Sequence, residues 1–281
     1  MTATPPILGK KRYSEPTTFT AENLLREARR QKSLTRVQVP QICVLDPDGD
    51  MVRWLVRSRG LERESSWACY HTDLYALTHE GVRFGIIGCA VGASFAVLVA
   101  EELFASGCEL LISVTSAGQI MSIGDTPYFV LVEKALRDEG TSYHYVPPAD
   151  FSHLAPELLS VLGDAFLHAP VAVHRGATWT TDAPFRETAT AIAHCRELGI
   201  LAVEMEAAAL YAFAKARQKA VICFAHVTNQ MACAEGDFEK GPNGGSQDAL
   251  QVVALAAHAW RSHQAPRAGR EEGSMNASES R

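Results

Sequence analysis

Apolar residues occur along the chain in short uninterrupted runs and in longer stretches with helical spacing, and the two kinds alternate. The uninterrupted runs, typical of strands buried on both faces, are 42–45, 84–88, 110–114, 128–132, 171–175, 200–203 and 220–226. Stretches with one apolar face predict helices at 51–58, 93–106, 154–167, 186–198, 207–217 and 246–263. A strand, a glycine turn, a helix and a strand follow one another over 84–114, which predicts a βαβ unit and an α/β fold.

The two ends of the chain differ from its middle. Residues 1–38 predict a tail followed by a peripheral helix at 20–32, with Thr20 as its N-cap. Residues 264–281 are polar and predict a disordered tail. No repeat or linker divides residues 39–263, so we expect them to form one domain. Within it, the segment 231–245 is rich in glycine and acidic residues and is interpreted as a loop that could close over a ligand.

Two carboxylates stand where a buried strand at 200–203 meets an alanine-rich helix that begins at Ala207. In open α/β sheets, ligands bind at this carboxyl end of the strands. A desolvated carboxylate needs hydrogen-bond donors, and a polyol with two adjacent hydroxyls supplies them. Glu204 and Glu206 therefore indicate a sugar-binding position. The alternative is that one glutamate caps the helix and the other is solvated.

Composition excludes several classes of protein. The net charge of -6 leaves no basic surface for nucleic acid. The uncharged run 84–100 approaches the length of a membrane span, but its glycines predict a strand, a turn and a helix instead. The seven cysteines lack CxxC pairing, which predicts reduced thiols in a cytoplasmic protein. The ten histidines lack metal-ligand spacing, so no metal is expected.

Three segments carry a resemblance to a known family. The string Glu-Met-Glu-Ala-Ala-Ala-Leu at 204–210 resembles the ribose-binding signature of the nucleoside phosphorylase and nucleosidase superfamily, in its uridine phosphorylase-like branch. The string Arg-Asp-Glu-Gly-Thr-Ser-Tyr-His-Tyr at 137–145 is similar to the stretch that lines the nucleoside pocket there. Residues 179–188 resemble the loop on the side of the base. On their chemistry alone, the last two segments could equally be solvated polar loops.

The resemblance implies a fold, an assembly and a set of site residues. The fold is a three-layer α/β/α sandwich with a central mixed, partly barrel-like sheet, and the assembly is a homodimer or homohexamer. The implied catalytic residues are Glu206, Asn229 and Arg137. The implied ribose-binding residues are Met205, Glu206, Glu204 and His144, and the base-binding residues are Phe185, Arg186, Asp182 and Tyr143. Anion binding would fall to Thr115, Ser116, Gly118 and Gly92.

The chain departs from the family at the phosphate site, where three arginines are expected. Leu45 opens the Asp-Pro-Asp turn in place of glycine and no arginine follows until Arg53, the second position falls near 69–71, and Ile112 stands at the third. Guanidinium forks grip an oxyanion in a bidentate manner, so their loss leaves phosphate poorly neutralised. Backbone amides at 88–94 and the hydroxyls of Thr115 and Ser116 could still bind an anion, with charge supplied by Arg53, His71, Arg137 or Arg186.

These patterns favour an enzyme that cleaves the N-glycosidic bond of a nucleoside, without a cofactor. Phosphorolysis with inorganic phosphate is the expected reaction, and hydrolysis or nucleoside binding without catalysis are the alternatives. Asn229 stands where purine enzymes of the family have an acidic Asp, which fits a pyrimidine leaving group. A serine hydrolase elbow at 92–96 is disfavoured because Ala96 replaces its last glycine.

Overall fold

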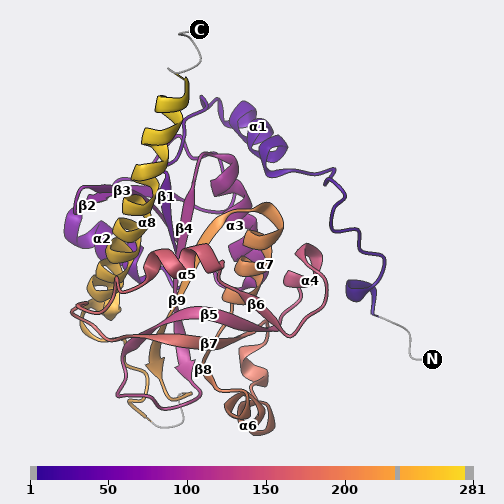
Figure 1. Cartoon of the computed structure of the whole chain (residues 1–281), viewed down its shortest axis with the longest axis vertical. Helices are drawn as coiled ribbons and strands as arrows, with labels where there is room; N and C mark the ends of the chain where they lie inside the picture. Colours follow the sequence, from indigo (N-terminus) through magenta and orange to yellow (C-terminus); the bar gives the residue numbers. More distant parts are fainter. Residues whose placement is uncertain (1–4, 232–234, 276–281) are drawn as a thin grey trace.

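A single mixed β-sheet lies between two layers of helices (Figure 1). The computed structural model describes residues 5–231 and 235–275, the side chains of 265–275 excepted. The strands are β1 (Ile42–Asp46), β2 (Leu74–His79), β3 (Val82–Gly88), β4 (Leu110–Gln119), β5 (Tyr128–Asp138), β6 (Phe151–His153), β7 (Val173–Thr181), β8 (Ile200–Glu204) and β9 (Ala220–Asn229). The helices are η1 (Pro6–Leu8), α1 (Ala21–Lys32), α2 (Asp50–Arg59), α3 (Ala93–Ala105), α4 (Ser142–Tyr145), α5 (Pro156–Leu162), η2 (Pro184–Arg186), α6 (Ala189–Glu197), α7 (Ala207–Arg217), η3 (Pro242–Gly245) and α8 (Ser246–Met275).

The sheet closes on itself over part of its width. Its strand order is β2-β3-β1-β4-β8-β7-β5-β6, and β9 pairs with both β4 and β5. The five strands β4, β8, β7, β5 and β9 therefore form a closed ring of pairings. The expected mixed, partly barrel-like sheet is confirmed.

The helices cover both faces because the strands are apolar on both sides. On one side α3 contacts α1 and α7, and on the other α8 contacts α2 and α5 (Figure 1). All five residues of β1 are buried, as are the first seven residues of α7. Tyr211 of α7 ties the layers together, because its hydroxyl donates to the carbonyl oxygen of Val132 at 2.5 Å and accepts from the amide of Cys223 at 3.1 Å.

The pairings bring the carboxyl ends of several strands to one edge. Asp46 at the end of β1 pairs with Gly88 at the end of β3, and Gly118 of β4 pairs with Asn229 of β9. Strand β8 pairs with β4 through Val203 and Gly118, which carries the Glu-Met-Glu segment to the same edge. The sequence predicted a ligand-binding edge at the carboxyl end of β8. The structure brings the carboxyl ends of β1, β3, β4 and β9 to the same edge.

The predicted strands and most of the predicted helices are confirmed, with differences at their ends. Thr20 caps α1, since its hydroxyl oxygen accepts from the amide of Asn23. Strand β4 extends to Gln119 and β7 to Thr181, beyond the ends predicted at 114 and 175, and β2 and β6 were not predicted. Helix α8 continues to Met275, beyond the end predicted at His263, and the rest of the predicted disordered tail, 276–281, lies outside the described residues.

The structure also gives the state of the cysteines and the character of the helices in the described residues. Cys43, Cys69, Cys108, Cys195 and Cys223 are buried free thiols, whereas Cys89 is exposed. Cys233 lies outside the described residues. Among residues 5–231 and 235–275, no helix combines the length and apolar character needed to cross a membrane, and no group of three or more His, Cys, Asp or Glu side chains is arranged to hold a metal ion.

Candidate functional site

Glu206 carries a buried carboxylate with one oxygen in use and one free. It follows β8 directly and is the N-cap residue of α7. Its Oε1 accepts a hydrogen bond from the backbone amide of Gly92 at 2.7 Å, whereas Oε2 is buried and has no hydrogen-bond partner among the described residues. Burial, and after it the neighbouring Glu204 carboxylate, raises the pKa of Glu206 to about 8. The free acceptor needs a donor, which a ligand hydroxyl would provide.

Glu204 is occupied by internal donors. Its Oε1 accepts from the hydroxyls of Thr178, at 3.1 Å, and Thr180. Its Oε2 accepts from the amides of Glu206 and Ala207, each at 2.7 Å. Burial raises the pKa of Glu204, and these four hydrogen bonds to the ionised form oppose that effect. The side chain of Glu204 therefore caps the first amides of the helix, as the alternative interpretation of the sequence had one glutamate do. Met205 lies half-buried between the two glutamates.

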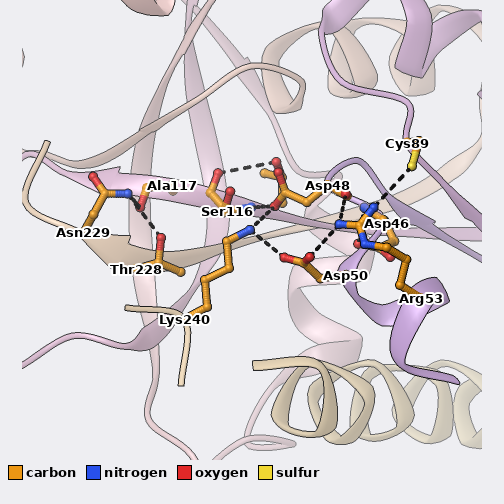
Figure 2. Close-up of polar contacts among 12 residues, drawn as sticks. Asp46, Asp48, Asp50, Arg53, Cys89, Ser116, Ala117, Thr228, Asn229 and Lys240 are labelled. Carbon is orange, nitrogen blue, oxygen red and sulfur yellow. Dashed lines mark hydrogen bonds and ion pairs between the residues drawn. The ribbon is translucent and has the colours of Figure 1, made fainter. Parts of the chain in front are cut away.

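The turn after β1 directs a second carboxylate to the same edge of the sheet. Asp48 Oδ2 accepts from the backbone amide of Ser116 at 2.9 Å and lies 3.4 Å from the Nζ of Lys240 (Figure 2). Asp46 is buried and accepts from the amides of Gly49 and Val52 at 3.2 and 2.9 Å. Burial raises the pKa of Asp46 to about 7. Asp46 thus shapes the turn, and Asp48 faces β4.

The two cations beside this turn are paired with carboxylates. Asp50 accepts from Arg53 and from Lys240, at 2.6 Å in each case (Figure 2). Arg53 also donates to the carbonyl oxygen of Asp48 at 2.7 Å and lies 3.7 Å from the Sγ of Cys89. The sequence named Arg53 as a possible source of charge for an anion, but the structure directs its guanidinium to the turn itself.

The residues predicted to bind an anion mostly serve carboxylates of the chain. The amide of Gly92 donates to Glu206 and the amide of Ser116 donates to Asp48. The Thr115 hydroxyl donates to the carbonyl oxygen of Ser116 at 3.4 Å, and its proximity to Glu206 opposes the rise in the pKa of that carboxyl. Gly118 has little free space, because a Cβ there would lie 2.7 Å from the Sδ of Met231.

A small cavity lies between this turn and the segment that carries Lys240. Its volume is about 20 Å³, and its polar lining consists of Asp46, Asp48, Asp50, Thr115, Ser116, His226, Lys240 and Ser246. A water molecule needs roughly 10–15 Å³ on this measure, so the cavity has room for about one water.

Asn229 lies at the end of β9, where the sequence placed it. Its Nδ2 donates to Thr228 Oγ1 at 3.2 Å and to the carbonyl oxygen of Ala117 at 3.5 Å, and its Oδ1 accepts from the amide of Met231 at 2.9 Å. The donor contacts are long for N–H···O bonds. The amide group therefore keeps donor capacity at the edge where β4 and β9 end.

Arg137 and the segment that follows it form a separate cluster on the rim. The buried guanidinium of Arg137 donates to Ser142 Oγ at 2.8 Å and to the carbonyl oxygens of Pro147 and Val146 at 2.7 and 3.4 Å, and it lies over the Tyr143 ring. His144 Nδ1 lies 2.8 Å from the Nζ of Lys11. These contacts hold the segment in shape and use three of the five N–H groups of Arg137.

The predicted base-side residues lie at the neighbouring strand end. Asp182 accepts from the amide of Gly140 at 2.8 Å, and Phe185 is fully exposed, as is Arg186 in large part. The pairings of Asp138 with Thr181 and of Thr180 with Glu204 place this loop and the Arg137 cluster along the rim that continues to Glu206. The structure therefore orders the predicted groups along one edge.

Two site residues were missed by the sequence analysis. Asp48 was noted only as part of a turn, and Lys240 only as part of a loop. The signal for Asp48 was an acidic turn at the carboxyl end of a buried strand. Lys240 gave no local signal, because its partner Asp50 is 190 residues away in the sequence.

Comparisons with known proteins place this geometry in a family. Residues 41–258 match the model of the Phosphorylase superfamily. A similar curated protein is the DeoD-type purine nucleoside phosphorylase of Bacillus thuringiensis (strain Al Hakam), 30% identical over 139 residues, which are 49% of this chain. The match spans 59% of the length of that relative.

Solved structures share the fold at low sequence identity. The uridine phosphorylase of Vibrio fischeri ES114 aligns with a TM-score of 0.65 and 20% identity over 89% of this chain and 99% of its own. The AMP nucleosidase of Bacteroides thetaiotaomicron VPI-5482 aligns with a TM-score of 0.67 and 16% identity over 86% of this chain and 99% of its own. By its fold and by the match over residues 41–258, the chain belongs to the phosphorylase superfamily.

Proposed function

We propose that the protein cleaves the N-glycosidic bond of a nucleoside and that the attacking group is water. The observation that carries this proposal is the hydrogen bond from the Ser116 amide to Asp48 Oδ2, at 2.9 Å. A carboxylate of the chain thereby takes the donor that the family resemblance assigns to phosphate. A phosphate dianion would also meet the carboxylates of the 46–50 turn, whose cations Arg53 and Lys240 are already paired.

Glu206 holds the sugar in this proposal. Its unpartnered Oε2 accepts a ribose hydroxyl, and the hydrogen bond stabilises the ionised carboxylate. A negative charge there also stabilises an oxocarbenium-like transition state. Glu204 keeps the β8–α7 junction in place through its four internal hydrogen bonds, so we assign it a structural role beside the sugar.

Asp48 acts as the general base. It takes a proton from water as the oxygen forms a bond to the anomeric carbon, and the bond from that carbon to the base nitrogen breaks with its electron pair on the base. The departing base takes up a proton from solvent and Asp48 returns its proton to solvent, which completes the conversion of nucleoside and water to free sugar and free base. The side-chain amide of Asn229 can donate to a base carbonyl, which favours a pyrimidine.

Phosphorolysis is the second candidate, and family membership favours it. Uridine phosphorylase and purine nucleoside phosphorylase are among the similar proteins, and so is an AMP nucleosidase. Membership in the uridine phosphorylase-like branch, a cytoplasmic location and a homodimeric or homohexameric assembly stay predictions.

The deciding experiment offers uridine and inosine separately, with and without inorganic phosphate, and identifies the sugar product. We expect free ribose at equal rates in both conditions, and a loss of activity of at least about a hundredfold in Glu206→Gln and Asp48→Asn. The exposed Asp125→Asn is the matched control and should behave as the unmodified protein. Ribose 1-phosphate formed only with phosphate would establish phosphorolysis, and retained nucleoside binding without turnover would favour the non-catalytic alternative.

A further inference from the structure

We infer that Lys240 is a positioning residue: it holds the Asp48 carboxylate in contact with the Ser116 amide. This inference rests on the proposed role of Asp48 as general base. Lys240 Nζ lies 2.6 Å from Asp50 Oδ2 and 3.4 Å from Asp48 Oδ2, the same oxygen that accepts from Ser116 (Figure 2). The lysine side chain is 20% exposed, so solvent screens these contacts only in part.

Lys240 is the cation that pairs with the Asp48 carboxylate, because the other charged groups nearby are carboxylates or are directed elsewhere. Four carboxylates face this region: Asp46, Asp48 and Asp50 from the turn and Glu206 from the β8–α7 junction. Arg53 of α2 bonds to the Asp50 carboxylate but only to the backbone carbonyl of Asp48. His226 of β9 supplies no charge near neutrality, because burial and then Lys240 lower its pKa to about 4. Within the described residues, Asp48 forms its ion pair with Lys240.

The pKa values of Asp50 and Lys240, which form the shorter contact, are shifted in the directions expected of an ion pair. Burial raises the pKa of Asp50, but hydrogen bonds from Lys240 and Arg53 outweigh it and the pKa is lowered. Burial lowers the pKa of Lys240, but the hydrogen bond to Asp50 and the charge of Asp48 outweigh it and the pKa is raised. Lys240 is therefore charged over the whole range in which the enzyme would work.

The backbone around Lys240 is built to hold it in this place. The amide of Glu239 donates to the carbonyl oxygen of Thr228 at 3.0 Å, which fixes the segment to β9 next to Asn229. Gly245 has a φ of +70°, and a Cβ on it would lie 2.6 Å from the carbonyl oxygen of Lys240. The lysine is thus held between β9 and the glycine turn that precedes α8.

The test compares Lys240→Met, which keeps much of the side-chain length without the charge, with the conservative Lys240→Arg. We expect Lys240→Met to lower kcat for the cleaved nucleoside by about tenfold and to leave KM little changed, because a displaced Asp48 impairs the reaction but not the binding of the nucleoside. Lys240→Arg should restore kcat. An unchanged kcat in Lys240→Met, or a loss that follows the melting temperature and that Lys240→Arg does not restore, would overturn the inference.

Asp48→Asn separates this outcome from failure of the proposed function. Full activity in Asp48→Asn would overturn the role of Asp48 itself, and with it the inference. An inactive Asp48→Asn together with an unchanged kcat in Lys240→Met would overturn only the role of Lys240. If both hold, Lys240→Met added to Asp48→Asn should cause no further loss, because the lysine acts through the aspartate.

Discussion

The backbone amide of Gly92 donates to Glu206 Oε1 at 2.7 Å, although 114 residues separate the two in the sequence. The contact joins the turn before α3 to the end of β8. It satisfies one oxygen of a buried carboxylate and leaves Oε2 as an acceptor without a partner among the described residues. Glu206 is therefore oriented before a ligand arrives, and its protonation is coupled to what binds there.

Nucleoside binding should release a proton near neutral pH. Burial and the Glu204 carboxylate raise the pKa of Glu206 to about 8, so the free protein holds a proton at pH 7. Ribose hydroxyls donate to the ionised form and expel it. Titration calorimetry at pH 7 in buffers of different ionisation enthalpy should show up to about one proton released, and binding should tighten from pH 6 to pH 8 by up to tenfold per unit.

Glu206→Gln supplies the control for this measurement. The variant should bind the nucleoside about 10- to 100-fold more weakly, as expected when a charged acceptor is lost, and its binding enthalpy should no longer depend on the buffer. A binding enthalpy of the unmodified protein that is the same in every buffer would show that Glu206 does not titrate on binding.

The same carboxylate should make the protein less stable as the pH rises from 7 to 8. A folded-state pKa of about 8, against an ordinary value of 4.5, means that the native state keeps a proton that the unfolded chain has lost. The free energy of unfolding therefore falls as pH rises through this interval, by up to ~1.4 kcal/mol per unit. Asp46, with a pKa of about 7, adds the same sign mainly at lower pH.

Urea denaturation at pH 7.0, 7.5 and 8.0 measures this slope. His226, whose pKa is lowered to about 4, contributes the opposite sign only up to its ordinary value of 6.5, so it does not obscure the interval. Glu206→Gln should flatten the slope, since it removes the titrating group. Equal slopes in the variant and the unmodified protein would contradict the assignment.

Substitution by glutamine should destabilise the protein far more at Glu204 than at Glu206. Glu204→Gln places an NH₂ group against some of the four donors that the carboxylate now accepts. A loss of about 2–4 kcal/mol in the free energy of unfolding is expected when a buried hydrogen-bonded group meets mismatched partners. Glu206→Gln should cost far less at pH 7, because its carboxyl is already protonated there. Similar urea midpoints for the two variants would refute this division of roles.

The sequence was most informative where the relevant contacts are local. The run at 200–203 followed by Glu204 and alanines predicted β8 and α7, because burial and helix propensity act within a few residues. It could not separate the two glutamates, since the choice depends on Thr178 and Thr180 of β7 and on Gly92 before α3. The extension of β7 to Thr181 has the same cause, because the hydroxyls of Thr178 and Thr180 find their hydrogen-bond partners on Glu204 and at the start of α7.

The anion site was the least predictable part. The sequence revealed the missing arginines but gave no sign of what replaces them. The contacts of Asp48 with Ser116 and Lys240 depend on pairings between β1 and β4 and on a loop close to the end of the chain. Such contacts arise from topology, which a pattern of apolar residues constrains but does not specify.

Gly245→Ala should reproduce the effect of removing Lys240, and Gly244→Ala should not. Both glycines have a left-handed backbone, with φ of +70° and +66°, so an alanine is strained by about 1 kcal/mol at either place. The difference is steric: a Cβ on Gly245 would lie 2.1 Å from His226 Cε1 and 2.6 Å from the Lys240 carbonyl oxygen, whereas on Gly244 its nearest contact is the Cβ of Asp50 at 3.7 Å.

Relief of that clash requires both the His226 ring and the Lys240 backbone to move, and movement of the backbone lengthens the contacts of the lysine side chain with Asp48 and Asp50. Melting temperatures and kcat for nucleoside cleavage, measured on the two alanine variants side by side, test this. We expect the larger fall in melting temperature in Gly245→Ala, together with a loss of kcat as in Lys240→Met. Matching kcat values and melting temperatures for the two variants would mean that the Gly245 turn does not position the lysine.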